Sequence, residues 1–412
     1  MKAKTKTKRK IINKPELLAP AGNISSLLSA IEAGADAVYF GIKNLNMRHE
    51  ASNFDVLEIK KVMKRLHESG LKGYLALNVL VYDDELSKVK NIITEAKKAK
   101  VDGVICWDAA VISLAKKAGL NINISTQASV SNFEAVSFYN DLGAKKIILA
   151  RECSLETIKD IVKKIKKHKL TCQIETFVHG AMCVSISGRC FLSQDAFGKS
   201  ANRGKCLQPC RREYLITDKD KEAEYIIGED YILSARDLCS IEFIDKLIEA
   251  GIASFKIEGR MRQAEYVKEV TEAYRKAIDA YFNKKLTLKL KKTLKKKLEG
   301  VYHRSYSDGF YFKTPPAGKA MVEREYDKIY LGDVRKYFNK IGVAEIIIRA
   351  GRLDIGDKVL ISGPKTLALF SKISEIEINH KRVKSALKGQ IVGIKVVSRV
   401  RPEDKLFIWK KK

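Results

Sequence analysis

From Pro15 to about Phe282 the chain alternates between short apolar runs and longer amphipathic stretches. The runs are continuously apolar, and several of the amphipathic stretches end at glycine, as helices usually do. Continuous apolar strands separated by helices are typical of a parallel sheet covered on both faces. The eight runs lie at 16–20, 36–41, 72–78, 102–108, 121–127, 145–151, 171–177 and 253–259. Eight such units predict an α/β fold, a (β/α)8 TIM-like barrel.

The connection between the seventh and eighth runs is unusually long. It spans roughly 75 residues, far more than a strand–helix connection requires. This insertion begins with a cysteine-rich loop over residues 179–212, which must leave from the mouth of the barrel. The apolar spacing over 263–282 then predicts the last barrel helix.

The pattern changes on either side of the barrel. Residues 283–325 are basic and contain several Gly and Pro, which predicts a linker with one or two short elements. Residues 326–412 alternate apolar and polar positions between glycine turns, which predicts a small C-terminal β-barrel domain. Residues 1–14 form a basic arm, and because no apolar stretch follows them they do not resemble a secretory signal. The expected organisation is therefore a basic arm, a barrel over 15–282, a linker and a β domain.

Charge suggests the kind of partner. The chain has 78 Lys and Arg against 49 Asp and Glu, a formal net charge of +29. Such an excess attracts polyanions, above all RNA or DNA, although lysines on ordinary solvated faces would give the same count. No apolar run reaches the roughly 20 residues of a membrane helix, so we expect a cytoplasmic protein without membrane association. Clustered cysteines in that compartment serve metals or catalysis more often than disulfides.

The cysteine loop holds four of the chain's eight cysteines, spaced C-x6-C-x15-C-x3-C. Four thiolates suit a zinc ion or an iron–sulfur cluster. Structural zinc usually takes C-x2-C pairs, and this loop has none, so the spacing favours a cluster; zinc and catalytic or buried thiols stay open. The four candidate ligands are Cys183, Cys190, Cys206 and Cys210, with Cys239 as the reserve for the fourth position.

Polar residues stand where the predicted strands end. Because catalytic groups of (β/α)8 barrels lie at the carboxyl ends of the strands, we expect these side chains to converge on one polar pocket. Asp108 and Arg151 stand at two such ends. The candidate proton-transfer or positioning groups are Glu175, His179, Lys256 and Glu258. The candidate contacts to substrate or RNA are Asn78, Gln127, Arg189, Arg203, Arg211, Arg212 and Arg260.

Several motifs resemble the peptidase U32 family, and the resemblance covers nearly the whole chain. They are ELLAPAGN (16–23), ETFVHGAMCVSISGRCFLS (175–193), NRGKCLQPCR (202–211) and SFKIEGRMR (254–262). The resemblance implies a 4Fe–4S cluster held by Cys183, Cys190 and Cys206, with Cys210 the nearest candidate for the fourth ligand. It is strongest to the branch that hydroxylates the wobble uridine of tRNA to 5-hydroxyuridine, without oxygen and with prephenate as cosubstrate. Ribosomal RNA is the alternative substrate.

Two other classes of function stay open. Some members of the family carry a collagenase or peptidase label. The sequence has neither H-E-x-x-H nor G-x-S-x-G, so a peptidase would need Cys183 as nucleophile and His179 as base. The other alternative is a non-catalytic RNA-binding factor that works with a paralogous partner protein. The sequence therefore favours an RNA-modifying enzyme with two competitors.

Overall fold

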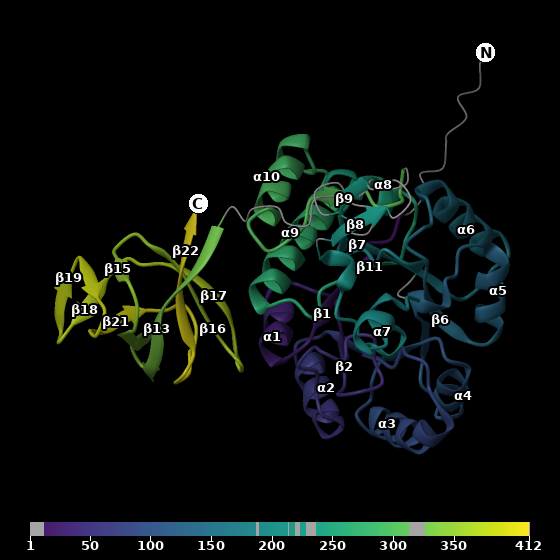
Figure 1. Ribbon diagram of the computed structural model, residues 1–412, viewed down its shortest axis with the longest axis horizontal. Helices are drawn as coiled ribbons and strands as arrows, with labels where there is room; N and C mark the ends of the chain where they lie inside the picture. Colours follow the sequence, from purple (N-terminus) through teal and green to yellow (C-terminus); the bar gives the residue numbers. More distant parts are fainter. Residues whose placement is uncertain are drawn as a thin grey trace, which may run out of the picture.

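The computed structural model describes residues 12–186, 189–212, 214–218, 223–227, 236–312 and 326–411. Eight parallel strands close into a barrel, which confirms the predicted (β/α)8 fold (Figure 1). The first seven pair in chain order, and β11 pairs with both β7 and β1. The barrel strands are β1 (Glu16–Ala21), β2 (Ala37–Gly41), β3 (Lys72–Ala76), β4 (Gly103–Cys106), β5 (Ile122–Ile124), β6 (Ala144–Ile148), β7 (Gln173–Gly180) and β11 (Ser254–Ile257).

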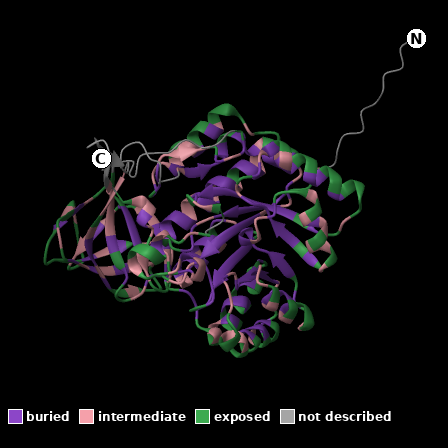
Figure 2. Cartoon of the chain, turned by 45° about the vertical axis from the view of Figure 1, so that its right-hand side comes forward, coloured by how far each residue is buried: buried purple, intermediate pink, exposed green. Residues whose placement is uncertain are grey.

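Helices surround the barrel, and each buries one face against it. Figure 2 shows the barrel strands as the buried centre of the molecule. Side chains at Asn23, Asp108 and Ser154 cap three of them by accepting backbone N–H groups. Among the described residues no helix is both long and apolar enough to cross a bilayer. The α-helices of the barrel are α1 (Ile24–Glu32), α2 (Ile59–Glu68), α3 (Leu86–Lys98), α4 (Ala109–Lys117), α5 (Phe133–Asp141), α6 (Leu155–Lys167), α8 (Ile244–Glu249) and α9 (Ala264–Phe282). Single 3-10 turns are η1 (Val56–Glu58), η2 (Asp83–Glu85), η3 (Thr126–Ala128) and η7 (Ile241–Phe243).

The long insertion folds over the carboxyl end of the barrel and then returns along β7. Its last strand, β10 (Asp237–Cys239), runs antiparallel to β7 and also pairs with the short β12 (Tyr306–Ser307). The barrel sheet is thereby extended by two strands outside the closed ring. The other elements of the insertion are α7 (Leu192–Phe197), η5 (Ala201–Arg203), η6 (Pro209–Arg211), β8 (Tyr214–Asp218) and β9 (Ala223–Ile227).

The segment that we predicted as a linker over 283–325 differs from that expectation in its described part. Its helix α10 (Leu288–Leu298) packs beside α9 and buries Leu294 and Leu298. Farther along, Arg304 and Tyr311 are buried against the barrel. Residues 283–312 therefore belong to the barrel domain. Their lysine-rich composition hides a narrow apolar stripe, which made the helix look like a solvated connection. Residues 313–325, like residues 1–11 of the basic arm, lie outside the described residues.

The C-terminal domain is antiparallel β, as predicted. Eight strands form one sheet in the order β17-β16-β22-β13-β14-β21-β18-β19, β15 pairs with β20, and both sheets enclose one apolar core. The domain docks on α1 and α9 (Figure 1), where Ser25 Oγ donates to the Thr366 carbonyl oxygen at 2.5 Å. Its strands are β13 (Tyr326–Phe338), β14 (Val343–Ile348), β15 (Arg352–Asp354), β16 (Lys358–Gly363), β17 (Thr366–Lys372), β18 (Ile376–Ile378), β19 (Lys381–Val383), β20 (Ser385–Leu387), β21 (Ile391–Lys395) and β22 (Lys405–Lys411).

Candidate active site at the barrel mouth

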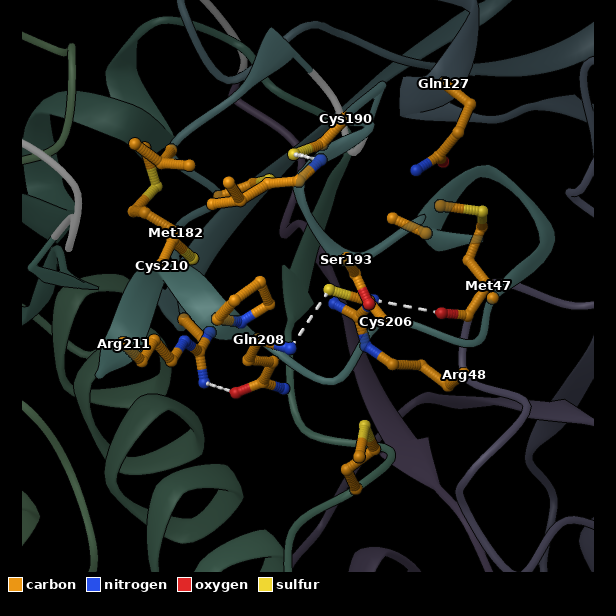
Figure 3. Close-up of a pocket in the computed structure, with 18 of the residues that line it drawn as sticks. Met47, Arg48, Gln127, Met182, Cys190, Ser193, Cys206, Gln208, Cys210 and Arg211 are labelled. Atoms are coloured by element: carbon orange, nitrogen blue, oxygen red, sulfur yellow. Dashed lines mark hydrogen bonds between the residues drawn. The ribbon is translucent and has the colours of Figure 1, made fainter. Parts of the chain in front are cut away.

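A pocket of about 900 Å³ lies between the barrel mouth and the cysteine loop, and Figure 3 shows its lining. A second pocket of about 440 Å³ lies deeper, inside the mouth. The two share five lining residues, so they adjoin each other. The shared residues are Met47, Arg48, Thr126, Gln127 and Arg151. The outer pocket is also lined by Cys183, Cys190, Cys206 and Cys210, which the sequence proposed as metal ligands.

Three of these cysteines share one local backbone arrangement. In each case the backbone N–H two residues further along the chain donates to the sulfur at 3.4 Å. The three pairs are Ser185 N to Cys183 Sγ, Leu192 N to Cys190 Sγ and Gln208 N to Cys206 Sγ. The loop is thus folded so that backbone N–H groups are directed at these sulfurs.

Cys210 lines the same pocket as the other three cysteines of the loop, and Cys239 does not. Burial raises the pKa of the Cys210 thiol, and the neighbouring Cys183 and Cys206 add to that rise, as expected when thiols gather around one space. Cys239 lies buried in β10 and lines neither pocket, and burial raises its pKa to about 12. The other three cysteines, Cys106, Cys153 and Cys172, are buried, as expected of core residues.

All four thiols line the same pocket. Thiolates are soft ligands that suit iron, and a four-iron cluster takes one thiolate at each iron. Cys183, Cys190, Cys206 and Cys210 could therefore hold a 4Fe–4S cluster.

The cysteine loop is anchored on the connection between β2 and α2, residues 42–55. Gly204 has a φ of 80°, and a Cβ there would lie 2.0 Å from the Asn46 carbonyl oxygen, so only glycine fits. The Gly204 carbonyl oxygen in turn accepts from the His49 backbone N–H at 3.1 Å. Beside it, Arg203 donates to the Leu80 carbonyl oxygen and pairs with Glu85. The sequence proposed Arg203 as an RNA contact, and here it fastens the loop.

Glu258 lies between two arginines at the mouth. Arg48 Nε donates to it at 3.1 Å, and Arg151 Nη2 lies 3.4 Å from its other oxygen. Burial by itself would raise the pKa of Glu258, but Arg48, Arg151 and Arg260 outweigh it and lower the pKa. Sequence reasoning missed Arg48, because it does not stand at a strand end. The unusual length of the β2–α2 connection is the signal that could have drawn attention to it.

Three further predicted contacts reach the inner pocket. Asn78 accepts from the Met47 backbone N–H at 3.2 Å, which fixes the turn before Arg48. Gln127 is buried and lines both pockets. Arg260 is also buried, and its Nη1 donates to Asn46 Oδ1 at 2.8 Å. Burial lowers the pKa of Arg260 to about 10, so it still carries its charge at neutral pH.

The remaining predicted arginines differ in their position relative to the outer pocket. Arg211 lines it and donates to Gln208, while burial lowers the Arg211 pKa to about 10. Arg189 donates to the Gln127 carbonyl oxygen at 2.8 Å without lining either pocket. Arg212 is exposed, with its guanidinium 4.6 Å from the centre of the Phe197 ring.

Glu175 and Lys256 lie deeper in the barrel. Lys256 Nζ and Lys146 Nζ lie 3.1 and 3.3 Å from the carboxylate of Glu175, and Lys146 also pairs with Glu16. Burial would raise the pKa of Glu175, but the two lysines outweigh it and lower the pKa. Lys256 lines the inner pocket, whereas Glu175 does not. The structure therefore places Lys256 at the site and Glu175 in a charged layer below it.

His179 does not reach either pocket. The pairing of β7 with β11 shifts by one residue at a bulge, so that His179 lies beside the outward-facing Ile257 instead of pointing into the barrel. Its ring is buried among three tyrosines, and its Nδ1 lies 3.3 Å from the Tyr274 hydroxyl. Burial lowers the pKa of His179 to about 3. The predicted convergence on the rim is therefore wrong for this residue.

Comparison with known proteins shows which family shares this arrangement. A collagenase of Porphyromonas gingivalis is 38% identical over 97% of this chain and 99% of its own. The tRNA hydroxylation protein P1 of Bacillus subtilis is 37% identical over 96% of this chain and 95% of its own. A 23S rRNA 5-hydroxycytidine synthase of Escherichia coli is 38% identical over 64% of this chain and 39% of its own. The sequence model of peptidase family U32 matches residues 22–333, from the end of β1 into the C-terminal domain. The chain therefore belongs to peptidase family U32.

Proposed function

We propose that this protein is an RNA-modifying enzyme that hydroxylates the wobble uridine of tRNA to 5-hydroxyuridine, with a 4Fe–4S cluster and prephenate as cosubstrate. The observation that carries the proposal is the pair of adjoining pockets in which four thiols lie beside the arginines of the barrel mouth. Relatives named for hydroxylation of tRNA and of ribosomal RNA support the reaction class. The net charge of +29 supports a polyanionic substrate.

The thiols of the outer pocket would hold the cluster. A cluster bound there would supply one-electron chemistry at the mouth of the barrel. The chain's own contribution is a set of backbone N–H groups directed at three of the sulfurs. Arg211, on the same lining, offsets part of the negative charge of four thiolates.

The inner pocket suits an anionic cosubstrate. Among the described residues of the barrel interior, five cationic side chains stand against three carboxylates, an excess of two positive charges. The cations are Arg48, Lys146, Arg151, Lys256 and Arg260, and the carboxylates are Glu16, Glu175 and Glu258. Prephenate carries two carboxylates, and planar guanidinium groups bind carboxylates in pairs of hydrogen bonds.

The uracil base would enter through the outer pocket. A base has to be unstacked before a reaction can take place on its ring. Unstacking costs least for a base in a single-stranded loop. Gln127 lines both pockets and so lies beside the path by which a base would enter. Lys256 and Glu258, on the inner lining, are the groups placed to hold or move a proton there.

The test is mass spectrometry of RNA nucleosides from a strain without this gene. We expect loss of 5-hydroxyuridine from tRNA, restored by the wild type and by Cys172→Ala but not by Cys190→Ala. Cys172 is the matched control because it is buried away from both pockets. Unchanged tRNA together with loss of a hydroxylated nucleoside from ribosomal RNA would transfer the proposal to the alternative substrate.

The peptidase alternative is less well supported by the geometry. Cys183 lines the outer pocket, but His179 is buried outside it among tyrosines, so the two do not form a nucleophile–base pair. With its pKa lowered to about 3, His179 would also be a weak base. Gelatin cleavage by highly purified wild type that disappears in Cys183→Ser, with all RNA nucleosides unchanged, would replace hydroxylation by proteolysis.

A further inference from the structure

We infer that the cleft between the barrel and the C-terminal domain binds a single-stranded segment of the RNA substrate beside the modified nucleotide. This inference rests on the proposed function and adds the surface that holds the rest of the strand. The cleft has a volume of about 1130 Å³ and receives residues from both domains.

Aromatic rings line the cleft from both sides. Tyr302, from the barrel domain, is 40% exposed. Tyr326, Phe407 and Trp409 come from β13 and β22 of the C-terminal domain. The Tyr326 and Trp409 rings are nearly parallel, with an angle of 16° between their planes and 6.1 Å between their centres. Rings set along a groove are the usual platform for unpaired bases, since every base has a face that stacks.

Cationic side chains accompany these rings. The Arg262 guanidinium lies 4.4 Å from the centre of the Tyr302 ring. Lys328 Nζ lies 4.4 Å from the centre of the Phe407 ring and also pairs with Glu265 at 2.9 Å, the carboxylate that lines this cleft. Alternating aromatic and cationic groups bind the bases and the phosphates of one strand together. A polypeptide would use the rings but would gain little from the cations.

The cleft adjoins the four-thiol pocket. Met261 lines both spaces, and it is 44% exposed. It follows directly on Arg260 of the inner pocket, in the connection between β11 and α9. An RNA strand lying in the cleft would therefore need only a short further length of RNA to reach the mouth of the barrel. This continuity distinguishes the cleft from an isolated surface groove.

The two walls of the cleft are fixed relative to each other. Lys328, on β13, donates to Gln263 at 2.8 Å across the domain boundary. Close by, Ala264, Leu360 and Ala368 form a small buried apolar cluster between the domains. Because the walls are already fixed, the protein loses little conformational entropy when RNA binds. More of the free energy of base stacking therefore contributes to the affinity.

The inference is tested by fluorescence anisotropy of fluorescein-labelled oligouridine with the full chain. We expect Tyr302→Ala and Tyr326→Ala each to weaken binding about tenfold, the loss typical of one stacked base. Phe138→Ala is the matched control, because Phe138 is an aromatic side chain, 59% exposed, on α5, away from the cleft. Its affinity should equal that of the wild type.

Three results would overturn the inference. One is equal affinity of wild type, Tyr302→Ala and Tyr326→Ala. Another is equal loss in all three variants, which would point to a general effect of removing an aromatic ring. The third is displacement of oligouridine by gelatin but not by unlabelled RNA, which would assign the cleft to a polypeptide. Nucleoside analysis of the wild type and the same variants separates the two proposals. If tRNA is hydroxylated but the tyrosine variants bind RNA as tightly as the wild type, only the inference about the cleft is rejected. If the wild type does not hydroxylate RNA, the proposed function is rejected.

Discussion

Arg48 holds Glu258 through two of its nitrogens, since Nε and Nη2 both lie 3.1 Å from the same carboxylate oxygen. Arg48 belongs to the connection after β2, whereas Glu258 directly follows β11. The pair therefore fastens a loop across the mouth of the barrel. Because Gly204 of the cysteine loop packs on that same connection, the Arg48–Glu258 pair links the thiol pocket to the barrel strands.

Replacing Glu258 by Gln should leave two partly buried guanidinium groups without their shared carboxylate. We expect the free energy of unfolding of cluster-free protein to fall by about 3 kcal/mol, the loss typical of a broken buried pair. Chemical denaturation measures this value. Glu95→Gln is the control, because it removes only the exposed pair with Lys98 and should cost under about 0.5 kcal/mol. Equal losses in both variants would contradict the prediction.

The same variant should also change how stability depends on pH. The arginines lower the pKa of Glu258, so its contribution is present above the unfolded pKa, about 4.3, and disappears as the pH falls through the lower folded value. Between about pH 5 and pH 3 we therefore expect the wild type to lose more stability than Glu258→Gln. Parallel curves for the two proteins would show that the carboxylate is not held ionised.

The fourth ligand of the cluster can be decided by a pair of variants. Cys210 lines the thiol pocket and Cys239 does not, although the sequence left both open. We expect anaerobically purified Cys210→Ala to lose the brown colour and the bound iron and sulfide, and Cys239→Ala to keep them. Cys239→Ala should cost about 1 kcal/mol of stability, because it leaves a small buried cavity. Retention of iron in Cys210→Ala would exclude it as a ligand.

Glu175→Gln tests the charged layer below the site. It would leave Lys146 and Lys256 without their common carboxylate, and we expect a loss of about 3 to 5 kcal/mol in the free energy of unfolding. Asp160→Asn, which removes only the exposed pair with Lys164, should change stability little. Full stability of Glu175→Gln combined with lost hydroxylation would restore the catalytic role that the sequence suggested.

The fold could be predicted from the sequence to a large extent, because each barrel strand is buried on both faces and is therefore continuously apolar. The sequence also pointed to the cysteine loop, and its four thiols do line one pocket at the barrel mouth. The pattern of apolar and polar residues could not show which way a side chain points where the pairing of two strands is irregular. The bulge in β7 and the crossing of Arg48 from a neighbouring loop both depend on pairings that form only in the folded barrel.

Composition is a poor guide to burial in this chain. The lysines of α10 suggested a solvated linker, yet Lys291 is buried and pairs with Asp245 at 2.7 Å. Long basic side chains bury their stems and keep only the charged end near a partner. Likewise, Lys146 of β6 lies inside the barrel between Glu16 and Glu175. Counting charges therefore says little about where they lie.

For His179, a structural role and a catalytic role predict different results and can be told apart by experiment. Burial among the tyrosines lowers its folded pKa to about 3, whereas an unfolded chain binds a proton near about 6.5. The neutral ring therefore stabilises the fold above about pH 6.5, and that contribution declines as the pH falls toward the folded value, by at most about 1.4 kcal/mol per unit.

His179→Phe fills the same aromatic site without a titrating group. We expect it to lose this component of the decline between about pH 6.5 and pH 5, while 5-hydroxyuridine in tRNA stays at the wild-type level. If folded His179→Phe no longer hydroxylated tRNA, the ring would act in the reaction despite its burial. A stable and active variant would show that this histidine packs the outer face of the barrel and takes no part in the chemistry.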